Sequence, residues 1–173
     1  VQGLAEGTPT SAQALVQRAR TEAEDREASE RRRRTEAMRR LADLLGRGRT
    51  AVERGRAAGS LAVQETGDVD SVEVRDGLSL VERALDELAA LQREIDVVAA
   101  DAEHSDPEPV ADRVAVVLER LERTADQVVG ASERARDAAR RAAAVAEGLA
   151  RVRAEVAALA GRARAAVEVA RVR

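Results

Sequence analysis

Apolar residues recur at alternating spacings of three and four positions along the C-terminal part of the chain. The resulting seven-residue repeat continues without a skip, and a sustained 3.5-residue period predicts a helix that supercoils against a partner. Asp106 and Pro107 are suited to the N-cap and the first helical position. We therefore expect one very long helix over residues 107–173. Its large seam residues are Val114, Leu121, Val128, Val145, Leu149, Val152, Val156 and Leu159.

A shorter repeat lies directly upstream and predicts a second helix over residues 79–104. Ser79 and Glu82 have the spacing of a capping box. Only His104 and Ser105 separate this helix from the cap of the next one, and such short connections make neighbouring helices antiparallel. The two helices are therefore expected to form a hairpin with unequal arms. The seam of the shorter arm includes Leu88, Leu91, Ile95 and Val98.

The first half of the chain predicts a less regular helix over residues 11–58. Its part from 20 to 36 contains no Leu, Val or Ile and is expected to be a solvated, charged helix. A seam appears only over residues 37–58, where Leu41 and Leu44 are its largest members. Glycines at seam positions indicate either very close helix approach or a loosened helix end.

Residues 59–78 break every period with glycines and acidic residues, and we expect them to be a connector. Residues 1–10 are expected to be a flexible N-terminal segment. A connector that reverses the chain gives a three-helix bundle, which we favour. A connector that only bends it lets residues 37–104 line the long arm as one broken partner. The predicted class is all-α: an elongated antiparallel hairpin or three-helix coiled-coil bundle with one very long C-terminal helix, forming one elongated module.

Composition supports packed helices over a rounded core. The 173 residues include no aromatic residue, no cysteine and one histidine, and all 29 basic residues are arginine. Ala, Val and Leu must therefore build the core, and they suit closely approached helices better than a compact interior. A net charge of −3 is too small for general attraction to nucleic acid or anionic lipid. No apolar run approaches the ~18 residues of a membrane span, so we expect a soluble chain.

An arginine-rich stretch at residues 29–40 is the main candidate for binding an anionic partner. Acidic residues are interleaved with it at the favourable i,i+4 spacing, which favours a solvated face stabilised by its own ion pairs. No aromatic side chain is present to stack on bases. The candidate patch is Arg31, Arg32, Arg33, Arg34, Arg39 and Arg40. The expected ion pairs are Glu22–Arg26, Glu27–Arg31, Glu30–Arg34 and Glu36–Arg40.

Catalytic and metal chemistry find little support in the residue types. The chain has no cysteine nucleophile and no second histidine for a zinc site. The GRGR at residues 46–49 lacks the features of a phosphate loop. His104 lies among acidic residues that form either a weak cation site or, as we favour, a helix cap with solvated charges. We expect no enzymatic activity, no cofactor, no metal and no small-molecule substrate.

These features predict a structural or interaction coiled-coil module that acts as a stalk, spacer or scaffold. The long arm outreaches its intramolecular cover, which favours self-association or docking of a protein partner on the exposed seam. The start at Val1 and the periodicity at Arg173 indicate a piece of a larger protein or assembly. One alternative is peripheral binding of a membrane surface or nucleic acid through the arginine patch. Another is a signalling relay in which the seam switches between two registers. Cytoplasmic and secreted locations are both allowed.

Overall fold

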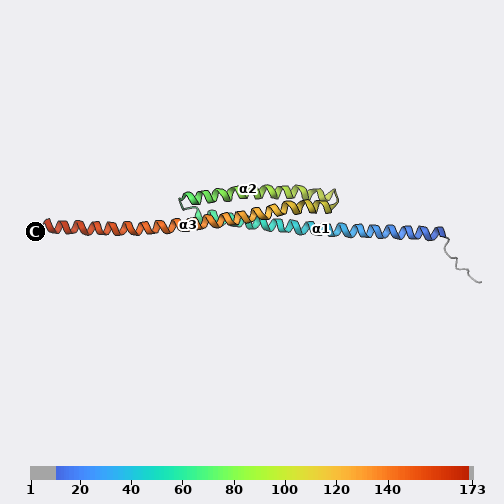
Figure 1. Ribbon diagram of the computed structural model, residues 1–173, viewed down its shortest axis with the longest axis horizontal. Helices are drawn as coiled ribbons and strands as arrows, with labels where there is room; N and C mark the ends of the chain where they lie inside the picture. The colour runs from blue at the N-terminus through green and yellow to red at the C-terminus, as the bar shows by residue number, and fades with distance from the viewer. Residues whose placement is uncertain (1–10, 172–173) are drawn as a thin grey trace, which may run out of the picture. The chain divides into compact units, whose positions relative to one another are not determined.

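Three α-helices make up most of the chain in the computed structural model, which describes residues 11–171 (Figure 1). Helix α1 spans Ser11–Thr66, α2 spans Val72–Ala100 and α3 spans Pro107–Arg171. A 3-10 turn, η1, covers Asp101–Glu103. The described residues contain no strand. The prediction of an all-α helical bundle with a long C-terminal helix is confirmed, and α3 has 65 residues.

The predicted bounds of the connector, residues 59–78, are wrong, because residues 59–66 and 72–78 are helical and only 67–71 link the two helices. Helix α1 continues beyond residue 58 to Thr66, and α2 begins at Val72, well before residue 79. The expected flexible segment 1–10 and the last two residues of the predicted helix 107–173 lie outside the described residues.

Close helix approach explains why Gly59 and Gly77 do not end the helices, whereas Gly67 lies in the turn directly after α1. A Cβ added to Gly59 would lie 2.9 Å from Cδ1 of Leu85, and one added to Gly77 would lie 3.0 Å from Cβ of Ala135. A glycine inside a helix costs about 1 kcal/mol relative to alanine. Here the missing side chain admits the neighbouring helix, and the packing gained offsets that cost.

The chain reverses between α1 and α2, as favoured from the sequence. Going forward along α1, Gly55 faces Leu88 and Gly59 faces Leu85, so the facing residues run backward along α2. The two helices are therefore antiparallel over this stretch.

The described chain divides into two compact units. The first combines the start of α1 up to Arg47 with Glu94–Leu118, and the second combines Gly48–Arg93 with the part of α3 that begins at Glu119. In the first unit the buried side chains include Leu41, Ile95 and Val114. The prediction that the whole chain acts as one elongated module stays a prediction.

The core of the second unit is made of small and medium apolar residues, as the composition indicated. One cluster contains Val81, Val128 and Ala131, with the partly buried Leu85 packed against it. Another joins Val74 of α2 to Ala138 and Ala139 of α3. Figure 1 shows α2 running beside α3, in agreement with these contacts.

Candidate interaction surface on helix α3

The heptad repeat of α3 continues far beyond the part of the helix that is covered. Its buried residues within the second unit extend to Ala139, which is 5% exposed. After that point every described residue of α3 is exposed or half-buried. The large apolar side chains at the repeat's seam positions on this stretch, here called the C-terminal seam, are Val145 (62% exposed), Leu149 (52%), Val152 (56%), Val156 (59%) and Leu159 (57%).

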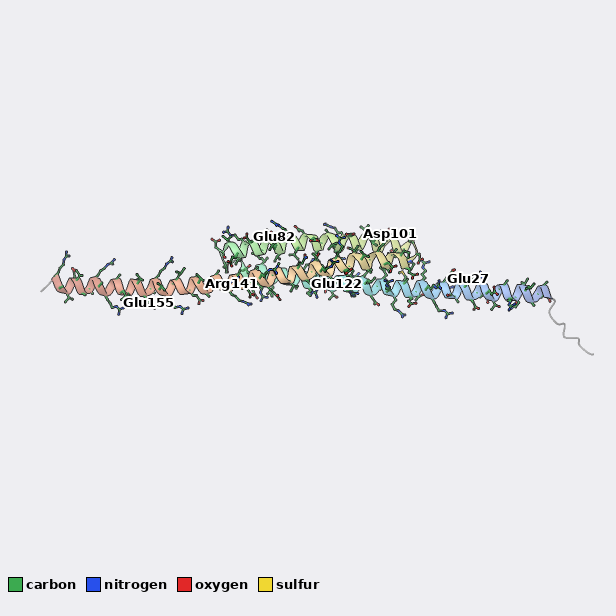
Figure 2. The ribbon with its side chains drawn as sticks, in the orientation of Figure 1. Glu27, Glu82, Asp101, Glu122, Arg141 and Glu155 are labelled. Atoms are coloured by element: carbon green, nitrogen blue, oxygen red, sulfur yellow. The ribbon has the colours of Figure 1, made fainter. Side chains whose placement is uncertain are left out.

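The cover stops because the other two helices end there. Near the end of α1, Glu65 forms an ion pair with Arg136 of α3. Near the start of α2, Glu73 forms an ion pair with Arg141 of α3. Glu73 Oε2 and Arg141 Nη2 are 3.5 Å apart. Figure 2 shows Arg141 where the cover ends and Glu155 farther along α3, with no other described helix of the second unit beside it. The exposed seam therefore begins just past both helix ends.

The other predicted seam residues lie in the interior of their units. All are 9% exposed or less, and Val114, Leu121 and Val128 are fully buried. A single repeat along α3 thus has a buried part and an exposed part. The buried members are Leu41, Leu44, Leu88, Leu91, Ile95, Val98, Val114, Leu121 and Val128.

The six arginines of the candidate patch are exposed on α1, and two of them are engaged in ion pairs. Arg31 Nη2 lies 2.9 Å from Glu27 Oε2, as predicted. Arg40 was expected to pair with Glu36, but its Nη1 lies 2.8 Å from Asp112 Oδ1 of α3. That partner is distant in sequence, so no spacing rule could have found it.

The remaining patch residues differ in their surroundings. Arg32 Nε lies 3.4 Å from the carbonyl oxygen of Ala28, to which it donates. Arg39 is exposed and makes no ion pair within residues 11–171. Two further expected pairs, Glu22–Arg26 and Glu30–Arg34, are absent from the same part of the chain.

The turn between α2 and α3 faces part of this patch across a shallow hollow of about 830 Å³ in the first unit. Both signs of charge line it: Arg33 and Arg34 on one side, Glu103 and Asp106 on the other. Asp106 caps α3 as predicted, since its Oδ1 accepts a hydrogen bond from the backbone N–H of Glu108 at 3.2 Å. Acidic residues so close to the arginines reduce the attraction of the hollow for a polyanion.

Metal ligation and membrane insertion find no support in the described part of the chain. Residues 11–171 contain no group of three or more acidic, histidine or cysteine side chains placed to hold a metal ion. Within that stretch, no helix combines the length and the apolar character needed to span a bilayer.

Comparison with known proteins found no match: the chain resembles no protein-family model, no curated protein and no solved structure.

Proposed function

We propose that the protein is a non-enzymatic interaction module that holds another helix along its C-terminal seam. The exposure of that seam, in register with a repeat that is buried elsewhere on the same helix, supports this proposal. The helical bundle would serve as the scaffold or spacer from which the seam projects. No bond-making chemistry is required of it.

The expected partner is an α-helix because the repeat has a period of 3.5 residues. A neighbour that stays in contact with such a stripe over several turns must follow the same supercoil. A sheet edge or an irregular loop has no matching period. The partner's contacting face should therefore also be apolar with heptad spacing.

Burial of the seam would supply free energy for binding. Full burial of an exposed Val or Leu side chain contributes about 1.5–3 kcal/mol, and each large seam side chain has 52–62% of its surface left to bury. Association costs about 4–15 kcal/mol in lost translational and rotational freedom. The large seam residues together can offset the lower end of that range. Flanking alanines would add contact area because they let the two helix axes approach closely.

Site-specific photo-cross-linking in the cells that make the protein tests this proposal. A benzophenone amino acid at Leu149 lies in the seam, and one at Ala154, on the opposite helix face, is the matched control. We expect covalent adducts from position 149 and none from position 154. The adducts are identified by mass spectrometry as another copy of the chain or as a different protein.

An adduct with another copy of the chain or with a different protein supports the proposal if it forms from position 149 and not from position 154. Equal labelling from both positions, or no adduct from either, would overturn it.

A further inference from the structure

From Val145 onward, the seam positions on the exposed end of α3 carry large side chains first and small ones afterwards. Val145, Leu149, Val152, Val156 and Leu159 come first. The same repeat then continues with Ala163, Ala166 and Ala170. A partner that fits this seam must be small where the seam is large and large where it is small, since facing positions interdigitate best in that way.

A second copy of the same stretch, turned end for end, has this complementary order on either side of the centre, where Val156 and Leu159 face each other. We propose that residues 142–171 of two copies pair as an antiparallel coiled coil centred between Ala157 and Ala158. This inference rests on the proposed function and names its partner. The layers would place Val145 opposite Ala170, Leu149 opposite Ala166, Val152 opposite Ala163, and Val156 opposite Leu159 of the partner subunit.

Charged residues beside the seam fit the same arrangement. Glu155 and Arg162 are seven residues apart and occupy the same position of the repeat, directly before a seam residue. In an antiparallel pair, these positions of the two helices lie on the same side of the interface. In the proposed register their side chains, which lean toward the N-terminus of each helix, converge. Glu155 would then meet Arg162 of the partner subunit, and the twofold symmetry repeats the pair.

The same two charges disfavour the neighbouring registers. Sliding one helix by a heptad in one direction brings Glu155 opposite Glu155 of the partner subunit. Sliding it the other way brings Arg162 opposite Arg162 of the partner subunit. Like charges facing each other are destabilising, so the charges select one antiparallel register.

In a parallel pair, neither the Glu155 and Arg162 charges nor the order of seam side-chain sizes is complementary between the two helices. In it Glu155 would face Ala160 and Arg162 would face Val167 of the partner subunit, with no ion pair. Large seam residues would meet large ones in one half, and alanines would meet alanines in the other. Both features therefore favour the antiparallel pair.

Cross-linking of single-cysteine variants of the full chain tests the orientation, because the sequence contains no cysteine of its own. Val152→Cys mixed with Ala163→Cys should form a cross-linked dimer with a short bifunctional maleimide. Neither variant alone should do so, since identical positions would be about 16 Å apart along the axis. Efficient self-cross-linking of Val152→Cys would indicate a parallel pair and overturn the proposal.

Sedimentation equilibrium of charge variants tests the register. Glu155→Arg and Arg162→Glu, each alone, should raise the dimer dissociation constant roughly ten-fold, because each replaces two attractive contacts with repulsive ones. An equimolar mixture of the two variants should restore wild-type affinity, since opposite charges then face each other again. Glu147→Arg and Arg164→Glu, which lie off the interface, are the matched controls and should leave the affinity unchanged.

Failure of this inference can be told apart from failure of the proposed function. A chain that stays monomeric, or charge variants that behave like their controls, overturns the antiparallel pair. If position 149 then still labels a different protein, the interaction module stands with another partner. If it labels nothing, both fall.

Discussion

Arg136 of α3 and Glu65 of α1 form a bidentate ion pair within the second unit. Nη2 of the arginine lies 3.0 Å from Oε1 of the glutamate, and Nε bonds to Oε2. The side chains are 24% and 39% exposed, the least of any ion pair described here. The parallel donors of a guanidinium match a carboxylate in this geometry. The contact therefore ties the end of α1 to one position on α3.

The pKa of Glu65 should report this contact. The hydrogen bond from Arg136 lowers the pKa of the Glu65 carboxyl below its ordinary value. Since the folded-state pKa is lowered, the stabilisation is complete above the unfolded-state value of about 4.3 and is lost as the pH falls through the folded-state value. Titration of the Glu65 carboxyl by NMR should show the lowered midpoint.

Replacing Arg136 with glutamine should return the midpoint of Glu65 toward its ordinary value. Arg134→Gln is the control on the same helix and should leave the midpoint unchanged. A wild-type midpoint equal to that of the Arg136→Gln variant would contradict the ion pair.

Truncation of leucines on α3 should separate the covered from the exposed part of the repeat. Leu121 is fully buried and Leu149 is 52% exposed, although both occupy the same heptad position. Leu121→Ala should lower the free energy of unfolding by about 2–5 kcal/mol, whereas Leu149→Ala should change it by about 0.5 kcal/mol or less. Urea denaturation is to be followed at a concentration where the chain is monomeric. Equal losses for the two variants would show that Leu149 is covered within the chain.

Gly77→Ala should destabilise the second unit despite the higher helix propensity of alanine. The new Cβ would lie 3.2 Å from the backbone Cα of Ala135, which cannot move without shifting α3. Overpacking costs about 1–3 kcal/mol, against a propensity gain of about 1 kcal/mol.

Gly130→Ala is the matched control for this substitution. Its Cβ would meet nothing closer than the end of Arg134, at 3.7 Å, so the unfolding free energy should rise by up to about 1 kcal/mol. Thermal unfolding of both variants measures the difference. A stabilised Gly77→Ala protein would contradict the close approach of α2 and α3.

Heparin chromatography should show that the arginine patch binds polyanions weakly. Acidic residues of α1 and of the turn before α3 lie among its arginines, so we expect no retention at about 0.15 M salt. Glu27→Gln combined with Glu30→Gln should create retention by removing nearby acids. Glu147→Gln with Glu168→Gln changes the net charge equally at a distance and serves as the control. Strong, salt-dependent retention of the wild type would instead support an anionic partner.

Glycine was the residue type whose role was hardest to predict from the sequence. The residues around Gly59 and Gly77 have the composition typical of a loop. A glycine in such a sequence can end a helix or allow a neighbouring helix to approach closely. The choice depends on whether another helix reaches it. Leu85 and Ala135 do so here, and they are distant in sequence from the glycines they face.

Ion pairs likewise fall into those that the sequence predicts and those that depend on the tertiary structure. The local pair of Arg31 with Glu27 follows from i,i+4 spacing along one helix. The pairs of Arg40 with Asp112 and of Arg136 with Glu65 join different helices, so they depend on how those helices are aligned.

The helical character of this protein and the face on which its apolar residues lie were determined by the sequence alone, because residues three and four positions apart lie on the same face of any α-helix. Which part of that face is buried was decided only by the tertiary structure. Leu121 and Leu149 are equivalent in the repeat, yet only Leu121 lies where α1 and α2 still cover α3. Burial requires a partner helix that reaches the residue, and here α1 ends at Thr66 and α2 begins at Val72.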